Sequence, residues 1–376
     1  MSELKKGAGA FAEFRPARDV LRVVSAVPTC LIQLDHATRV NGFPIERFTL
    51  MSGPSNEGKT KAAIALLGSF LKRGHMAMLV DAERTTPITW VRELIGAEAD
   101  SDQFLAMRPG SYEETVEAVR KFVTALKQER EAKRVHADTS ALVVVDSIRK
   151  LVPKNIMAKI MKDTEKNGVD GMGGRSAQIK AAMNAAWMDE LIPLLEETRT
   201  AMLVIARETD DPDADMWDKR AGRDYKIGGG KALYYDSSMV LRVERAGYIT
   251  EKFGDGESAT SKVYGERHRI TITKTKIAGR EERQSICYFH TSNGMLYAEG
   301  FDPGRDLLEL GERLGVVSKN GSWYAFDGQK IGNGTHAAAK AIAENGEMLA
   351  ALEHAVRAAF MMQAPIEISE DGEVIE

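Results

Sequence analysis

The sequence predicts an α/β protein, with a core built on a mostly parallel, twisted sheet, a short N-terminal arm and a small α+β C-terminal domain. Between about residues 30 and 300, short β-branched or apolar runs alternate with longer segments of helical period, which is typical of crossover units around a parallel sheet. After Gly300 shorter elements replace this pattern. The 376 residues exceed the usual size of one domain and 43% of them are apolar, which is ample for one large core with smaller attachments.

Composition excludes several classes of protein. No apolar run approaches the ~20 residues that a membrane span requires, and the N-terminus lacks the hydrophobic core of a secretory signal, so we expect a soluble, cytoplasmic chain. Cys30 and Cys287 lie far apart without a histidine cluster, which indicates neither a disulfide framework nor a zinc site. Because the net charge is −4, contacts with nucleic acid have to come from local basic patches.

We expect four segments along the chain. Residues 1–27 are polar and basic, with one short apolar helical stretch, and form an N-terminal arm. Residues 28–300 form the core and residues 301–362 the C-terminal domain. Residues 363–376 form an acidic, disordered tail, because acidic residues accumulate there and no Lys or Arg occurs beyond Arg357.

The core elements follow from periodicity. Helical segments at 61–71, 112–126 and 176–197 lie where crossovers between parallel strands require them. Strand-like runs come closer together from Gly230 to Gly300, which predicts antiparallel strands that extend the sheet. The apolar runs that we expect to form core strands are 48–51, 77–80, 142–145, 202–205, 239–242 and 270–273.

The C-terminal domain is predicted to contain a short helix, a small hairpin and two further helices. Residues 306–314 have the pattern of a short amphipathic helix. Trp323, Tyr324 and Phe326 precede Asp327-Gly328, a dipeptide typical of a tight hairpin turn. Two Ala-rich helical stretches follow.

A phosphate-binding loop is the strongest motif. Eight consecutive residues match G-x-x-x-x-G-K-[ST] between a predicted strand and a predicted helix, which is the context that the motif needs. Its glycines let backbone N–H groups approach phosphates, Lys59 reaches the terminal phosphates, and Thr60 can ligate Mg²⁺. The residues of this loop are Gly53, Pro54, Ser55, Asn56, Glu57, Gly58, Lys59 and Thr60.

Two acidic residues end predicted strands. Asp146 follows the apolar run 142–145, and its carboxylate is placed to hold the Mg²⁺ shell. Alone, such an Asp is more often a simple strand terminus, but the phosphate loop favours the nucleotide role. Glu83 ends the strand that contains 77–80 and can orient or deprotonate an attacking water; a solvated acid at a strand end is an equally good interpretation.

Taken in order, these motifs closely resemble the RecA recombinase family of bacteria and phages. The resemblance runs from about residue 28 to residue 360 and is specific because it includes the C-terminal domain. The segments that carry it are 53–60, Val80-Asp81-Ala82-Glu83, Val145-Asp146-Ser147, Gly229-Gly230-Lys231-Ala232-Leu233, Lys274-Thr275-Lys276-Ile277-Ala278, Gly321-Ser322-Trp323-Tyr324 and Lys330-Ile331-Gly332.

The resemblance implies a RecA-type P-loop core that uses ATP and Mg²⁺. It makes Glu83 the catalytic carboxylate and places Trp90 where the family stacks an aromatic ring on adenine; a core or surface tryptophan is the alternative. Lys274 and Lys276 match paired lysines that reach the ATP of a neighbouring subunit, although composition alone favours a solvated Lys-Thr-Lys face. The residues assigned to catalysis are Lys59, Glu83, Arg207, Lys274 and Lys276.

DNA contacts in the family come from two loops, which correspond to about 154–175 and 208–230. A single charge in either loop is more often a solvated surface residue than a contact. The candidates are Lys159, Lys162, Lys166 and Arg175 in the first loop, and Lys219, Arg220, Arg223, Tyr225, Lys226 and Gly228-Gly229-Gly230 in the second.

The sequence departs from the family at three places. These departures weaken the assignment of the family's DNA-binding and nucleotide-coupling roles to residues of this chain. Ala206-Arg207 stands where the family has Asn-Gln, so either Arg207 senses the terminal phosphate with a charged fork or the coupling differs. The first loop is longer than usual. The second loop opens with acidic residues that should repel DNA unless they point away, namely Glu208, Asp210, Asp211, Asp213, Asp215 and Asp218.

The resemblance also implies self-association. In the family the N-terminal arm donates a strand to the adjacent subunit, so that head-to-tail contacts build an open helical filament. Tyr235 matches an aromatic residue at that interface, with an ordinary sheet aromatic as the alternative.

The function that the resemblance implies is a DNA-dependent ATPase recombinase. It coats single-stranded DNA, pairs it with homologous double-stranded DNA and exchanges strands in recombination and repair, including the SOS response to DNA damage. Two alternatives remain open: an accessory or structural filament that binds ATP and DNA without strand exchange, and a ring-forming DNA translocase, which would hardly carry the domain with Trp323 and Tyr324.

Overall fold

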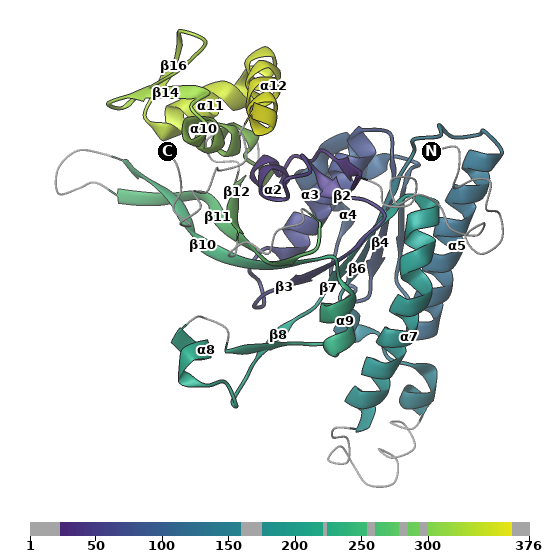
Figure 1. The fold of residues 1–376 in the computed structure, drawn as a ribbon. Helices are drawn as coiled ribbons and strands as arrows, with labels where there is room; N and C mark the ends of the chain where they lie inside the picture. Colours follow the sequence, from purple (N-terminus) through teal and green to yellow (C-terminus); the bar gives the residue numbers. More distant parts are fainter. Residues whose placement is uncertain are drawn as a thin grey trace, which may run out of the picture.

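The structure is a computed structural model that describes residues 23–158, 175–220, 224–253, 260–277, 285–293 and 300–362. Most of the expected arm and the whole expected acidic tail lie outside the described residues. Figure 1 shows a large core with the C-terminal domain on one side. None of the helices in the described part of the chain is long and apolar enough to cross a membrane.

A mixed, mostly parallel sheet forms the core, as predicted. Nine described strands lie in the order β13-β12-β11-β10-β3-β7-β6-β4-β5. Every residue of β3, β6 and β7 is buried, which explains their continuous apolar sequences. The strands that pair in parallel are β3 (Phe48–Ser52), β4 (Met76–Asp81), β5 (Phe104–Met107), β6 (Ala141–Asp146) and β7 (Thr200–Ile205), together with the start of β10.

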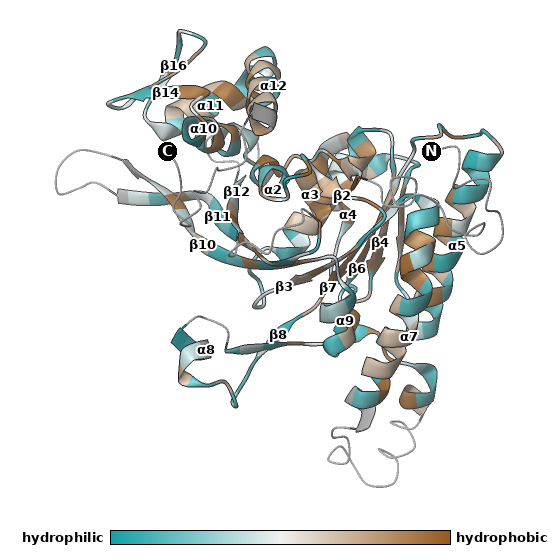
Figure 2. Ribbon diagram, viewed as in Figure 1, coloured by the Kyte–Doolittle hydropathy of each residue, from teal (hydrophilic) through white to brown (hydrophobic). Residues whose placement is uncertain are grey.

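Alternate residues of the central strands face two helical layers. Leu142 and Val144 of β6 belong to the apolar cluster that includes α3 (Lys59–Lys72). Val143 and Val145 belong instead to the cluster on the other face, with α5 (Tyr112–Glu131) and α7 (Arg175–Thr198). Figure 2 shows apolar residues along the central strands and on the sides of α5 and α7. All three predicted crossover helices are therefore confirmed.

The antiparallel extension of the sheet is confirmed and is longer than predicted. β10 (Met239–Phe253) pairs with β3 over its first four residues and with β11 (Thr260–Thr275) along its whole length. β12 (Ser285–Ser292) and β13 (Gly300–Phe301) follow. The far part of this strand pair escaped prediction because its sequence is rich in charged and polar residues, so no apolar alternation marks it.

Smaller elements complete the core. β5 was not predicted, because it is a short edge strand that leaves Leu105 and Ala106 exposed. The remaining elements are β1 (Ala26–Val27), α2 (Ile32–Ala37), β2 (Phe43–Pro44), α4 (Ile88–Ile95), η2 (Gly96–Asp100), η3 (Ile148–Lys150), β8 (Glu208–Asp210), α8 (Met216–Arg220), β9 (Tyr225–Ile227) and α9 (Lys231–Asp236).

The C-terminal domain has its own apolar core, to which Leu307, Tyr324 and Val356 belong. The predicted hairpin turn is confirmed, since Asp327 and Gly328 both have positive φ. The domain consists of α10 (Pro303–Arg313), β14 (Val317–Asn320), β15 (Trp323–Phe326), β16 (Gln329–Asn333), α11 (Thr335–Glu344) and α12 (Gly346–Met362).

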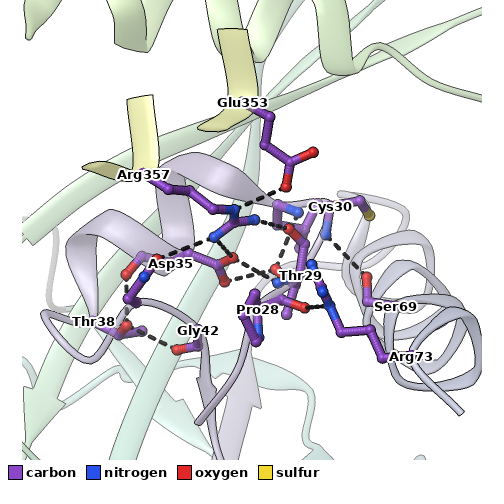
Figure 3. Close-up of polar contacts among 12 residues, drawn as sticks. Pro28, Thr29, Cys30, Asp35, Thr38, Gly42, Ser69, Arg73, Glu353 and Arg357 are labelled. Carbon is purple, nitrogen blue, oxygen red and sulfur yellow. Dashed lines mark hydrogen bonds and ion pairs between the residues drawn. The ribbon is translucent and has the colours of Figure 1, made fainter. Parts of the chain in front are cut away.

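A buried polar network joins α12 to the start of the core (Figure 3). The Arg357 guanidinium donates to the Asp35 carboxylate at 2.9 Å, to the Thr29 carbonyl at 2.8 Å and to the Asn41 side chain at 3.2 Å. Burial raises the pKa of Asp35 to about 6, although Arg357 and the hydrogen bonds of Thr29 lower it. The carboxylate thus depends on Arg357 for compensation of its charge.

Arg357→Met should lower the free energy of unfolding by about 3–5 kcal/mol, because it leaves the buried Asp35 carboxylate without its cation. Urea unfolding of the two proteins measures the difference. Arg92→Met is the matched control, since Arg92 pairs with Asp100 at an exposed site and its loss should have a far smaller effect. Equal effects of the two substitutions would contradict the prediction.

Candidate nucleotide-binding and catalytic site

The phosphate loop lies between β3 and α3, and residues of β10 and β11 pack closely against it. Gly53 has φ 147° and Gly58 has φ 99°. A Cβ on Gly53 would lie 2.0 Å from the Val243 carbonyl oxygen, and one on Gly58 would lie 2.5 Å from Nδ1 of His268. Both positions of the motif therefore require glycine for their conformation and for the close approach of β10 and β11.

The loop's functional side chains meet the end of β6. The Lys59 ammonium is largely buried and donates to the Gly53 carbonyl at 2.9 Å. Burial lowers the pKa of Lys59, partly offset by the Asp146 charge. The Thr60 hydroxyl donates to Asp146 at 2.6 Å, and burial raises the pKa of Asp146 to about 6. A hydroxyl and a carboxylate oxygen side by side are the hard donors that Mg²⁺ prefers, so these two residues fit the predicted ion.

Glu83 is engaged by two donors. Ser147 donates its hydroxyl to Oε1 at 2.6 Å, and Nη2 of Arg207 donates to Oε1 at 3.1 Å and to Oε2 at 2.9 Å. Burial raises the pKa of Glu83, but the hydrogen bonds from Ser147 and Arg207 outweigh it and leave the pKa lowered. Arg207 therefore lines the same cavity as the phosphate loop, and it pairs with the carboxylate that is expected to act as base.

A cavity of about 510 Å³ joins these groups. Trp90 and Lys61 line both this cavity and a neighbouring one of about 310 Å³. The indole thus lies between the phosphate loop and a second space that also borders Glu93 and Tyr248, which is a suitable place for a nucleotide base. Residues that line the larger cavity include Ser55, Asn56, Glu57, Gly58, Lys59, Thr60, Glu83, Asp146, Ser147 and Arg207.

Lys274 and Lys276 are not among the residues lining that cavity. They lie at the end of β11, where Lys274 donates to the Tyr235 carbonyl at 2.9 Å and Lys276 donates to the same oxygen at 2.8 Å. Burial, with a smaller effect of Lys276, lowers the pKa of Lys274 to about 8. The Tyr235 side chain is 61% exposed. These three residues form a surface group that is separate from the residues lining the cavity.

The second predicted DNA loop contains a hairpin of β8 and β9 with the short helix α8 between them. Lys226, a predicted DNA contact, pairs with Asp211 at 2.6 Å and with Asp213 at 3.2 Å. Part of the acidic charge is thus neutralised inside the hairpin, and Tyr225 packs under the guanidinium of Arg242. Lys159, Lys162, Lys166 and Arg223 lie outside the described residues, and of Arg175 the structure describes only the backbone at the start of α7.

Sequence reasoning missed two residues. Ser147 follows Asp146 directly, and only the fold brings its hydroxyl to Glu83. Trp217 on α8 is 75% exposed, with the Arg220 guanidinium 5.9 Å from its ring centroid. The signal for Trp217 was available in the sequence, since an aromatic residue beside Lys219 and Arg220 is typical of single-strand binders.

The fold and the site define a P-loop nucleoside triphosphatase, with the loop at the carboxyl edge of a mostly parallel sheet and acidic residues ending neighbouring strands. The family model described as RecA N-terminal domain matches residues 2–300, and the one described as RecA C-terminal domain matches residues 305–361. The chain therefore belongs to the RecA family. As a member it is a DNA-dependent ATPase of the recombinase class.

Relatives resemble the chain over nearly its full length. Protein RecA of Oleidesulfovibrio alaskensis is 24% identical over 375 residues, which cover 99% of this chain and 93% of that protein. Protein RecA of Lactobacillus delbrueckii is 26% identical over 377 residues, covering 100% of this chain and 90% of that protein. Protein RecA of Streptococcus mutans is 27% identical over 359 residues, covering 95% and 82%.

Proposed function

We propose that this protein binds ATP with Mg²⁺, assembles head-to-tail on single-stranded DNA as a helical filament, and exchanges strands with homologous double-stranded DNA. The observation that carries the proposal is the division of the catalytic groups. Lys59, Glu83 and Asp146 meet around one cavity, whereas Lys274 and Lys276 lie on a separate surface. Such a division suits an active site that is completed by a neighbouring subunit.

Each group in the cavity has a distinct task. Lys59 binds the terminal phosphates, and Thr60 with Asp146 would hold Mg²⁺, which supplies neutralisation of phosphate charge when bound. Glu83 orients the attacking water and accepts its proton. Ser147 holds the carboxylate in place through its 2.6 Å hydrogen bond. Trp90 offers its ring to the adenine.

Arg207 is proposed to respond to the terminal phosphate. Its fork is engaged with Glu83 at 2.9 Å and 3.1 Å, and a phosphate is a strong competitor for a guanidinium. Binding of ATP would draw Arg207 toward the phosphate and free the Glu83 carboxylate for water. This arrangement assigns to a charged fork the sensing role that the family gives to a glutamine.

Assembly and DNA binding use the remaining predicted segments. The arm of residues 1–27 would pair with a neighbouring core (28–300), with Tyr235 at the contact, while the C-terminal domain (301–362) and acidic tail (363–376) complete the chain. Trp217 is an exposed stacking platform with Lys219 and Arg220 beside it. The other proposed contacts with DNA phosphates are Lys159, Lys162, Lys166, Arg175 and Arg223.

The test is ATP hydrolysis with and without single-stranded DNA, combined with electron microscopy. We expect DNA to raise hydrolysis about 100-fold, because assembly brings the neighbour's lysines to the phosphates. Open helical filaments should form on the same DNA. Closed rings formed without DNA would instead indicate a translocase. An equal rate of ATP hydrolysis with and without DNA would overturn the proposal.

A second candidate is an accessory filament that binds ATP and DNA without strand exchange. It is favoured by two contacts: Arg207 covers Glu83, and Lys226 is paired with Asp211 and Asp213. A strand-exchange assay with homologous duplex DNA separates the two functions, since only a recombinase yields exchanged product.

A further inference from the structure

Glu208 on β8 joins the β8–β9 hairpin to two strands of the core, to β3 by a hydrogen bond and to β10 by a partly buried ion pair. The Glu208 side chain is only 5% exposed. Its carboxylate accepts a hydrogen bond from the Ser52 hydroxyl at 2.8 Å and from Nε of Arg242 at 3.2 Å to each oxygen. Ser52 is the last residue of β3 and directly precedes Gly53 of the phosphate loop.

The second strand of the hairpin is held by the same cation. The Arg242 guanidinium lies 4.5 Å from the centroid of the Tyr225 ring on β9. Arg242 belongs to β10 of the core sheet and pairs also with Glu244 at 2.9 Å. Figure 1 shows β8 leading away from the central sheet toward α8, so these contacts at its root connect the hairpin to the core.

Neighbouring residues of the chain thus contact two different segments next to the nucleotide site. Arg207 reaches Glu83, and Glu208 reaches the strand that enters the phosphate loop. A charged hydrogen bond in a partly buried setting is strong and directional. A shift of Ser52 on nucleotide binding would therefore act on the ion pair between Glu208 of β8 and Arg242 of β10.

We propose that Glu208 and Arg242 are positioning residues that couple the phosphate loop to the β8–β9 hairpin, and through it couple nucleotide to single-stranded DNA. The inference deepens the proposed function and rests on it. This coupling differs from phosphate sensing by Arg207, because Glu208 contacts Ser52 at the start of the phosphate loop and not the phosphate itself. The pair orients the hairpin and takes no part in the chemistry.

A double-mutant cycle tests the coupling. Affinity for fluorescent oligo-dT is measured with ADP and with a non-hydrolysable ATP analogue, and the ratio of the two dissociation constants reports the coupling. We expect Glu208→Gln and Arg242→Gln each to reduce that ratio about tenfold. The double variant should lose no more than either single variant, because one interaction is removed in all three.

Folding and hairpin order are checked independently of hydrolysis. Glu208→Gln keeps the shape of the side chain and leaves Arg242 paired with Glu244, so thermal unfolding should show a folded protein. Amide hydrogen exchange at 208–210 and 225–227 should rise in the variant, and its response to the ATP analogue should be lost. Asp210→Asn is the matched control, since it removes the same charge from an exposed position of the same strand, and it should keep the wild-type ratio.

The outcomes separate two failures. If the wild-type ratio is close to one, DNA affinity does not respond to nucleotide, and the proposed function falls together with the inference. If the wild-type ratio is large and Glu208→Gln retains it, the inference alone is wrong. Additive losses in the double variant would also overturn it, because the two residues would then act separately.

Discussion

Glu83→Gln should lower the steady-state rate of ATP hydrolysis by about 10³-fold, because an amide cannot accept the proton of the attacking water. The side chain keeps its shape, and its oxygen can still accept the hydrogen bond that Ser147 donates at 2.6 Å. Nucleotide binding should therefore persist. A coupled assay gives the rate, and a fluorescent ATP analogue gives the affinity.

Two further variants test whether the loss of hydrolysis in Glu83→Gln is specific to the carboxylate. Glu131→Gln, at the exposed end of α5, should hydrolyse ATP at the wild-type rate. Arg207→Met leaves the carboxylate free of its cation and should retain far more hydrolysis than Glu83→Gln while losing its response to DNA. A Glu83→Gln protein that hydrolyses ATP normally would show that another group activates the water.

Lys274→Ala should reduce DNA-stimulated hydrolysis by at least about 100-fold, as expected when a cation that stabilises the transition state is removed. The lysine lies at the end of β11, outside the cavity of its own subunit. The loss must then arise at the ATP of a neighbour. Lys72→Ala, an exposed lysine at the end of α3, is the control and should leave the rate unchanged.

Mixing subunits shows whether a neighbouring subunit supplies the lysine. Lys274→Ala and Lys59→Ala proteins should each be inactive alone. An equal mixture should recover about a quarter of the wild-type rate, because one boundary in four joins an intact phosphate loop to an intact lysine in a head-to-tail filament. No recovery would place both residues in the same subunit's site.

The sequence by itself determined the parallel core and the nucleotide-binding residues. The buried strands β3, β6 and β7 are continuous apolar runs, and the phosphate loop is a contiguous motif between one such strand and a helix. Such signals are local, so they need no knowledge of how distant segments meet. The hairpin turn at Asp327-Gly328 was predicted for the same reason.

Only the tertiary structure decided what surrounds those residues. Strand order brings Arg207 to Glu83 across 124 positions of sequence, and brings Glu208 to Ser52 across 156. It also pairs Lys226, a predicted DNA contact, with Asp211 and Asp213. An isolated charge in a sequence does not specify its partner, because pairing depends on which strand ends the fold places side by side. Local motifs were therefore enough to predict which residues form the nucleotide site. The contacts that hold Glu83 in place and that connect the site to the β8–β9 hairpin are long-range contacts, which only the fold creates.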